Sequence, residues 1–140
     1  MAATLDTSSA RGRHAAHRLS TDLIAWLTTV RSSGQPDSVP VWFLWRDDGI
    51  LIYSQPSRRK LRNLAGNPHV SLVLDGTDTG HDVVRIEGTA QVDTTQPPAS
   101  EVEPYVTKYA GEIRSSFGTP AVFARSYSVP LVVSPTKIHA

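Results

Sequence analysis

The chain has 140 residues, a length that fits one domain built around a single core. Hydrophobic residues make up 39% and the formal net charge is +1, so we expect a packed interior and neither a nucleic-acid nor a membrane partner. Cysteine is absent from the sequence, which excludes disulfides, thiolate metal sites and cysteine nucleophiles. The N-terminus is polar and no apolar run could cross a bilayer, so a cytoplasmic location is expected.

The first half of the chain predicts a helix followed by an antiparallel meander. Residues 1–12 are small and polar without periodicity, which predicts a flexible N-terminal arm before a single domain at 13–140. The expected elements are a helix at 13–24, strands at 26–30, 38–45 and 50–54, and an Asp-Gly hairpin turn at 46–49.

The second half combines short helices with alternating strands. Ser57 is a suitable N-cap for a helix at 58–66, which Gly66-Asn67-Pro68 ends. Gly88 marks a bulge or a close approach of two strands. The other expected elements are strands at 69–74, 83–92, 127–133 and 136–139, a helical region at 97–109 and a turn at 119–124.

Successive strands joined by tight turns argue against a doubly wound parallel sheet. The sequence therefore predicts a mainly β (α+β) protein, an antiparallel barrel that is closed or nearly closed and carries peripheral helices.

The strongest local signal is a basic cluster at the start of the helix at 58–66. It consists of Arg58, Arg59, Lys60 and Arg62. A helix N-terminus presents unpaired N–H groups, and arginine binds phosphate with two parallel hydrogen bonds. Ser54 and Ser57 add hydroxyl donors nearby. The cluster is typical of a phosphate site, and the alternative is a solvated helix face.

The second signal is the apolar strand Val39–Trp45, which Pro40 interrupts. Proline lacks an N–H, so this strand cannot be hydrogen-bonded on both sides there, and free backbone groups can meet a planar ligand. The alternative is core packing at a barrel edge. Trp26, Trp42 and Trp45 are more typical of packing or interfaces than of cofactor stacking.

Other catalytic patterns are missing from the sequence. His14 and His17 have no third metal ligand nearby, so no metal site is expected. The sequence contains neither a nucleophile elbow nor a glycine-rich phosphate loop. No catalytic acid, base or nucleophile can be assigned from the residues.

The order of motifs resembles the pyridoxamine-phosphate-oxidase-like split-barrel superfamily, most closely its actinobacterial branch of F420-dependent oxidoreductases. The motifs cover nearly all of the chain after the arm. They are Trp26–Val30, Val39–Trp45, Ile52–Pro56, Lys60–Leu64, Asn67–Leu72, Val84–Gly88 and Tyr127–Pro130. The resemblance implies a six-stranded antiparallel split β-barrel that forms a homodimer, with two cofactor sites at the subunit interface.

The resemblance also assigns roles to particular residues. The segment that lines the flavin-like ring would consist of Val39, Pro40, Val41, Trp42, Phe43 and Leu44. The cofactor phosphate would lie near Tyr53, Ser54, Arg59 and Lys60. Residues around Tyr105, Lys108 and Tyr109 would reach the partner's cofactor or close the substrate cleft. Because the chain ends soon after His139, we expect no counterpart of the residues that bind pyridoxamine phosphate, and no oxidation of that substrate.

These expectations combine into a hypothesis of function. A deazaflavin, coenzyme F420, would supply hydride chemistry for a small electrophilic substrate, while the protein supplies binding and orientation. FMN is the alternative cofactor, since its phosphate end is shared. A carrier that binds the cofactor without turnover and a nucleic-acid-binding module are the rival functions, and the near-neutral charge counts against the second.

Overall fold

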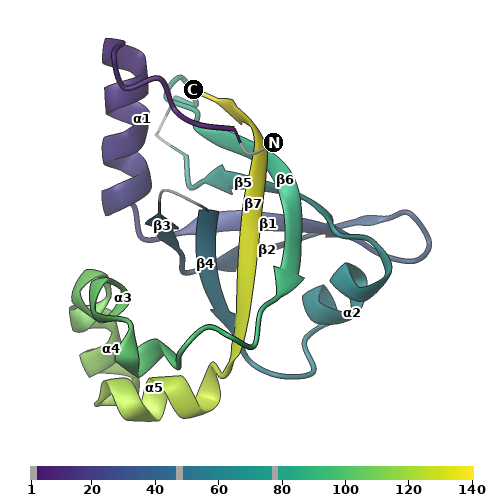
Figure 1. The fold of residues 1–140 in the computed structure, drawn as a ribbon, viewed down its shortest axis with the longest axis vertical. Helices are drawn as coiled ribbons and strands as arrows, with labels where there is room; N and C mark the ends of the chain where they lie inside the picture. The colour runs from purple at the N-terminus through teal and green to yellow at the C-terminus, as the bar shows by residue number, and fades with distance from the viewer. Residues whose placement is uncertain (1–2, 47–48, 77–78) are drawn as a thin grey trace.

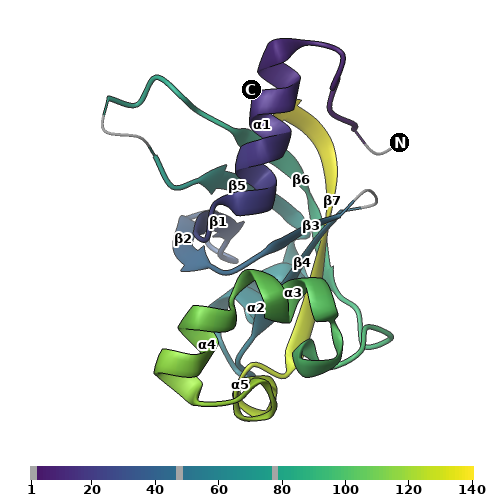
Figure 2. The same ribbon diagram turned by 90° about the vertical axis from the view of Figure 1, so that its left-hand side faces the viewer.

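In the computed structural model, which describes residues 3–46, 49–76 and 79–140, the chain forms a curled sheet with helices around it (Figures 1 and 2). The seven strands of the described residues lie in the order β2-β1-β5-β6-β7-β4-β3, and neighbouring strands are antiparallel. This sheet forms a half-barrel, which confirms the predicted mainly β split-barrel class.

The elements have the following bounds. The helices are α1 (Ala10–Thr21), α2 (Arg59–Gly66), α3 (Glu103–Lys108), α4 (Ala110–Phe117) and α5 (Pro120–Ser126), with a 3-10 turn η1 (Ala99–Glu101). The strands are β1 (Ala25–Val30), β2 (Pro36–Val41), β3 (Leu44–Arg46), β4 (Gly49–Ser54), β5 (His69–Leu74), β6 (Arg85–Val92) and β7 (Val129–His139).

Two apolar clusters form the interior, and β4 belongs to both. Ile50 and Ile52 belong to the barrel cluster, which contains residues of the strands together with Leu19 of α1 and Leu64 of α2. Leu51 belongs to a second cluster with η1, α3, α4 and α5, which gather at one end of the molecule in Figure 1. All six residues of β4 are buried, so this strand separates two layers of apolar side chains.

The first helix begins and ends earlier than predicted, because α1 covers Ala10–Thr21 and not 13–24. Ser9 is its N-cap and accepts a hydrogen bond from the Gly12 N–H at 3.0 Å, so helical geometry starts at Ala10. The Ala3 N–H donates to the Pro135 carbonyl oxygen at 2.9 Å. The flexibility expected for residues 1–12 stays a prediction.

The predicted strand at 38–45 is wrong, because it is two strands. β2 ends at Val41, β3 begins at Leu44, and Trp42 and Phe43 lie between them in neither strand. These two strands, β2 and β3, form the opposite edges of the sheet. In contrast, the two closing strands predicted at 127–133 and 136–139 form one strand, β7. The resemblance implied six strands, and the described residues form seven.

The β3–β4 hairpin is confirmed by the pairing of Arg46 with Gly49, while Asp47 and Asp48 lie outside the described residues. The register of β6 and β7 shifts between Glu87 and Gly88, which confirms the bulge predicted at Gly88.

Beyond α1, the predicted helix boundaries are wrong at three further places. Ser57 is not the N-cap of α2, because its φ of 64° is left-handed and Arg58 occupies the cap position. The helical region expected at 97–109 is divided into η1 and α3. Helix α4 was not predicted, and the segment at 119–124 is a full helix, α5. No helix of the described residues is both long and apolar enough to span a membrane.

Candidate functional site

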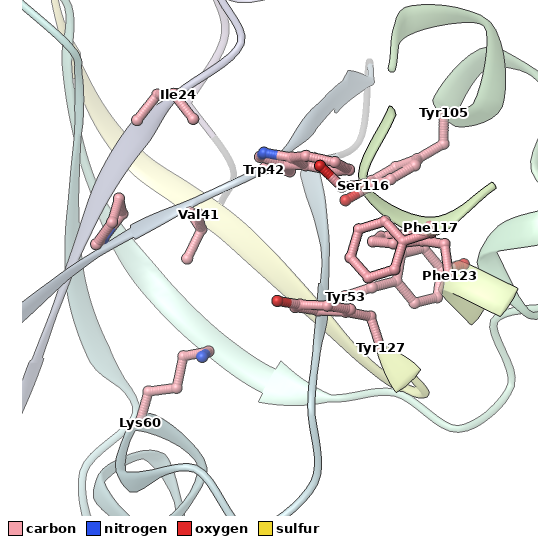
Figure 3. A pocket seen from close by; sticks show the side chains of 11 residues that line it. Ile24, Val41, Trp42, Tyr53, Lys60, Tyr105, Ser116, Phe117, Phe123 and Tyr127 are labelled. Carbon is pink, nitrogen blue, oxygen red and sulfur yellow. The ribbon is translucent and has the colours of Figure 1, made fainter. Parts of the chain in front are cut away.

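A cavity of about 330 Å³ lies between the end of β2, β4 and the helices α3, α4 and α5 (Figure 3). We call it the aromatic cavity, and its lining residues are Ile24, Pro40, Val41, Trp42, Tyr53, Lys60, Tyr105, Ser116, Phe117, Phe123 and Tyr127. Aromatic side chains gather on one side of it, and Lys60 enters from another side with its amino group directed inward (Figure 3). The volume and the apolar lining with a few polar groups are typical of sites for small organic ligands.

The aromatic side of the cavity is an ordered stack of rings. The Trp42 ring lies parallel to the Tyr109 ring at a centroid distance of 4.5 Å and to within 4°. Phe123 stacks on Trp42 at 5.3 Å and on Tyr127 at 5.0 Å, while Phe117 meets Tyr127 edge to face. Such packing holds flat apolar surfaces in place, and these surfaces favour a planar ligand.

Side chains from α3 and its C-cap hold the backbone at the break between β2 and β3. The Phe43 N–H donates to the Tyr109 hydroxyl oxygen at 2.8 Å, and that hydroxyl donates to the Leu23 carbonyl oxygen at 2.7 Å. The Lys108 amino group donates to the Phe43 carbonyl oxygen at 2.8 Å and lies 3.7 Å from the centroid of the Phe43 ring. Both backbone groups of Phe43 are thus bound by side chains instead of by a strand, and Trp42 is fixed next to the cavity.

Burial lowers the pKa of Lys108 from 10.5 to about 8, and the negative charge of Asp22 opposes part of this effect. Between pH 8 and pH 10.5 the Lys108 amino group is mostly neutral in the folded protein and mostly protonated in the unfolded chain. Unfolding therefore takes up a proton in this range. The free energy of unfolding of the wild type should therefore rise relative to that of Lys108→Met as the pH increases through this window. Urea unfolding at several pH values measures the difference, and the exposed Lys137→Met variant is the control for loss of charge. Parallel pH profiles for the wild type and Lys108→Met would contradict the prediction.

A second cavity, of about 360 Å³, lies at the N-terminus of α2. We call it the basic cavity, and its lining residues are Thr29, Asp37, Val39, Ser57, Arg58, Arg59, Lys60 and Arg62. Four cations thus face one carboxylate. Among the described residues, the first turn of α2 has neither an acidic side chain nor a side-chain cap, so its N–H groups add to the positive potential.

Asp37 is the negative group of the basic cavity, and it is held by three side chains. Arg31 lies 3.5 Å and Arg59 lies 3.9 Å from its carboxylate oxygens, and the Asn63 amide donates to it at 3.4 Å. This carboxylate offsets one positive charge, and the four cations of the cavity keep a net positive charge that favours an anion.

Lys60 lines both cavities and connects the two sets of residues. Burial lowers its pKa, and the neighbouring positive charge of Arg58 acts in the same direction. An anion bound beside Lys60 would reverse part of this effect. An aromatic cavity next to a cationic one fits a molecule with a planar ring and an anionic group, which is the chemistry of a flavin or a deazaflavin.

The structure brings most of the predicted cofactor residues to these two cavities. Pro40, Val41, Trp42, Tyr53 and Lys60 line the aromatic cavity, and Val39, Arg59 and Lys60 line the basic cavity. Their roles in binding stay predictions.

Three predicted residues lie outside both cavities. Phe43 is fully buried in the barrel cluster, and Leu44 is buried in the cluster of the helices. The buried Ser54 hydroxyl donates to the Gln55 carbonyl oxygen at 2.8 Å. Direct contact of these side chains with a ligand in either cavity is therefore not expected.

Several cavity residues were not identified from the sequence. They are Ile24, Ser116, Phe117, Phe123 and Tyr127. A signal was present, because Tyr105, Tyr109, Ile113 and Phe117 follow one another at intervals of four. This spacing is typical of one apolar face along successive helical turns, and it predicts a continuous aromatic surface.

Comparisons with solved structures show the same fold in proteins of different description. An F420 reductase is 23% identical with a TM-score of 0.69, and the match covers 88% of this chain and 94% of that one. A FAD-binding protein from Mesorhizobium loti is 13% identical with a TM-score of 0.63, covering 90% and 88%. The heme storage protein HutZ from Vibrio cholerae is 16% identical with a TM-score of 0.63, covering 91% and 92%. At these identities the likeness establishes the fold.

A search of curated proteins found no match. The family model described as pyridoxamine 5'-phosphate oxidase matches residues 13–138, a range that includes both cavities and the described sheet apart from His139, the last residue of β7. The chain therefore belongs to the pyridoxamine 5'-phosphate oxidase family, within the split-barrel superfamily.

Proposed function

We propose that the protein is an oxidoreductase that uses coenzyme F420 for hydride transfer to or from a small electrophilic organic molecule, as in the F420-dependent branch of the superfamily. The observation that carries this proposal is the pair of cavities that share Lys60. The aromatic cavity would take the planar ring system, and the basic cavity would take the phosphate. An F420 reductase among the structures of the same fold supports the choice of cofactor.

The bound cofactor would supply the hydride chemistry, and the chain's own residues would position it. Arg59 and Lys60 would hold the phosphate with charge-assisted hydrogen bonds. Arg58 and Arg62 would attract the acidic glutamyl tail of F420. The aromatic rings would exclude water from one face of the ring system and fix its orientation, which lowers the entropy cost of reaching the transition state.

We propose further that two copies of the chain assemble with the cofactor sites at their interface. An exposed apolar pair supports this arrangement, because Trp26 on β1 is 41% exposed and pairs with the exposed Pro40, which lines the aromatic cavity. A second chain packed over this pair would bury apolar surface next to the cavity.

Binding without turnover is the second candidate function. A heme storage protein of the same fold supports it, because that protein is described as storing its ligand. Both candidates require an occupied aromatic cavity. They differ in whether the reduced cofactor is consumed when an enone or a quinone is added.

Titration of the purified protein with F420 and, separately, with FMN tests the proposal. With cofactor fluorescence as the readout, we expect micromolar or tighter binding of F420 and weaker binding of FMN. Light scattering should give a molar mass of twice 15.2 kDa, the mass of a dimer. Preference for FMN would move the protein to the flavin-dependent branch. Binding of neither cofactor would overturn the proposed function. Reduced F420 that stays unconsumed with every enone and quinone would favour the carrier.

A further inference from the structure

A buried hydroxyl group in the wall of the aromatic cavity has no hydrogen-bond partner among the residues that the structure describes. The Tyr105 side chain is fully buried, and its hydroxyl makes no hydrogen bond to any of the described residues. Tyr105 is also one of the residues that line the cavity, and Figure 3 shows its ring extending from α3 toward the cavity. Buried hydroxyls in folded proteins almost always have a partner, so this one calls for an explanation.

The neighbouring tyrosines of the same cluster are different. The Tyr109 hydroxyl is bonded to Phe43 and Leu23, and the Tyr53 hydroxyl donates to the Pro97 carbonyl oxygen at 2.5 Å. The rings of Tyr53 and Tyr109 each lie 5.2 Å from the ring of Tyr105. One packing environment therefore holds two hydroxyls that serve the fold and one that does not.

The surroundings of the Tyr105 hydroxyl limit what it can bind. The rings of Tyr53, Tyr109 and Phe123 pack against the ring of Tyr105, and the hydroxyl itself is buried, so a charged group placed beside it would lose its hydration without a counterion. The cations of the basic cavity are at the start of α2, so an anionic group of the ligand would bind there and not at the Tyr105 hydroxyl. A neutral acceptor on a flat ring is the group that suits this position, because it can stack against the aromatic rings and accept one hydrogen bond.

We propose that the Tyr105 hydroxyl donates a hydrogen bond to a carbonyl oxygen conjugated to the planar ring of a ligand in the aromatic cavity. The carbonyl belongs either to the cofactor ring or to a quinone or enone substrate. The cofactor case rests on the proposed function above, and the substrate case does not. Burial, with the neighbouring tyrosines adding to it, raises the pKa of Tyr105 well above its ordinary value of 10, so the hydroxyl stays protonated and available as a donor.

The Tyr105→Phe variant tests this proposal, because it removes only the hydroxyl and keeps the ring. A hydroxyl without a partner does not stabilise the free protein, so we expect the melting temperature of the unliganded variant to equal or exceed that of the wild type. Affinity for the ligand should fall about 3- to 10-fold, the usual effect of one neutral hydrogen bond. If Tyr105 had only a packing role, removing its hydroxyl would leave the affinity for the ligand unchanged.

The matched control is Tyr109→Phe, which removes a hydroxyl that is bonded within the same cluster. We expect it to lower the melting temperature of the free protein. The probes are F420, FMN and the naphthoquinone menadione, each titrated into wild type and both variants. A loss confined to F420 or FMN assigns the carbonyl to the cofactor, and a loss confined to menadione assigns it to the substrate.

Three outcomes would overturn the inference. In the first, Tyr105→Phe destabilises the free protein as Tyr109→Phe does, which would mean that the hydroxyl already has a partner such as a bound water. In the second, every probe binds wild type and Tyr105→Phe equally well. In the third, no probe binds the wild type at all. Failure of the proposed function alone is distinguishable, because neither cofactor would then bind while menadione binding still depended on Tyr105.

Discussion

Replacing both Arg59 and Lys60 by alanine is expected to weaken F420 or FMN binding by about 100-fold or more. Each side chain would make a charge-assisted hydrogen bond to the phosphate, and such bonds contribute about 1.5–3 kcal/mol each. The loss of two of them corresponds to about two to four factors of ten in the dissociation constant. Cofactor fluorescence titration at fixed ionic strength measures the effect.

The same double variant should change the stability of the free protein very little. Arg59 is exposed, and its ion pair with Asp37 is long at 3.9 Å, so its contribution is at most about 1 kcal/mol. Burial disfavours the charged form of Lys60, so removing its amino group relieves a cost. A variant with Arg11→Ala and Lys137→Ala removes one arginine and one lysine from exposed positions elsewhere, and it should bind the cofactor normally. Equal affinity of the Arg59 and Lys60 variant and the wild type would sink the phosphate assignment.

Gly88→Ala is expected to lower the free energy of unfolding by about 3 kcal/mol or more. A Cβ atom at position 88 would lie 2.3 Å from the Ser134 carbonyl oxygen and 3.2 Å from the Cα atom of Pro135. Both contacts are with the backbone of β7, which cannot rotate away as a side chain would. The bulge at this place brings the two strands together, so relieving the contact requires β6 and β7 to separate locally.

Gly111→Ala is the matched control for Gly88→Ala. Gly111 lies in α4, and no described atom outside its own helix and chain neighbours lies within 4 Å of a Cβ placed there. Alanine is favoured over glycine in a helix by about 0.5–1 kcal/mol, so this variant should be as stable as the wild type or more so. Urea unfolding of the two variants gives the comparison. Equal stability of Gly88→Ala and Gly111→Ala would show that the strands have room to move apart.

The features that the sequence predicts correctly are local. Alternation of apolar residues identifies β5 and β6, because each strand has one side facing the barrel cluster. The basic residues at the start of α2 are close together in the sequence, and helix geometry alone brings them to one cavity.

The features that the sequence does not reveal depend on distant residues. The strand predicted at 38–45 is broken because Tyr109 and Lys108, more than sixty positions away, bind the backbone of Phe43. The aromatic cavity likewise needs α4 and α5 to fold back against the end of β2, which no local pattern states. The intervals of four from Tyr105 to Phe117 predict an aromatic surface, but not the strand it packs against.

The complete burial of β4 limits how this protein can be redesigned. Because Ile50 and Ile52 belong to the barrel cluster while Leu51 belongs to the helical one, removing η1, α3, α4 and α5 would leave an apolar strand face bare to solvent. A shortened version that keeps the sheet alone is therefore not a viable scaffold. Any effort to widen the cavity for larger substrates has to proceed by exchanging individual side chains such as Phe117, with the chain kept whole.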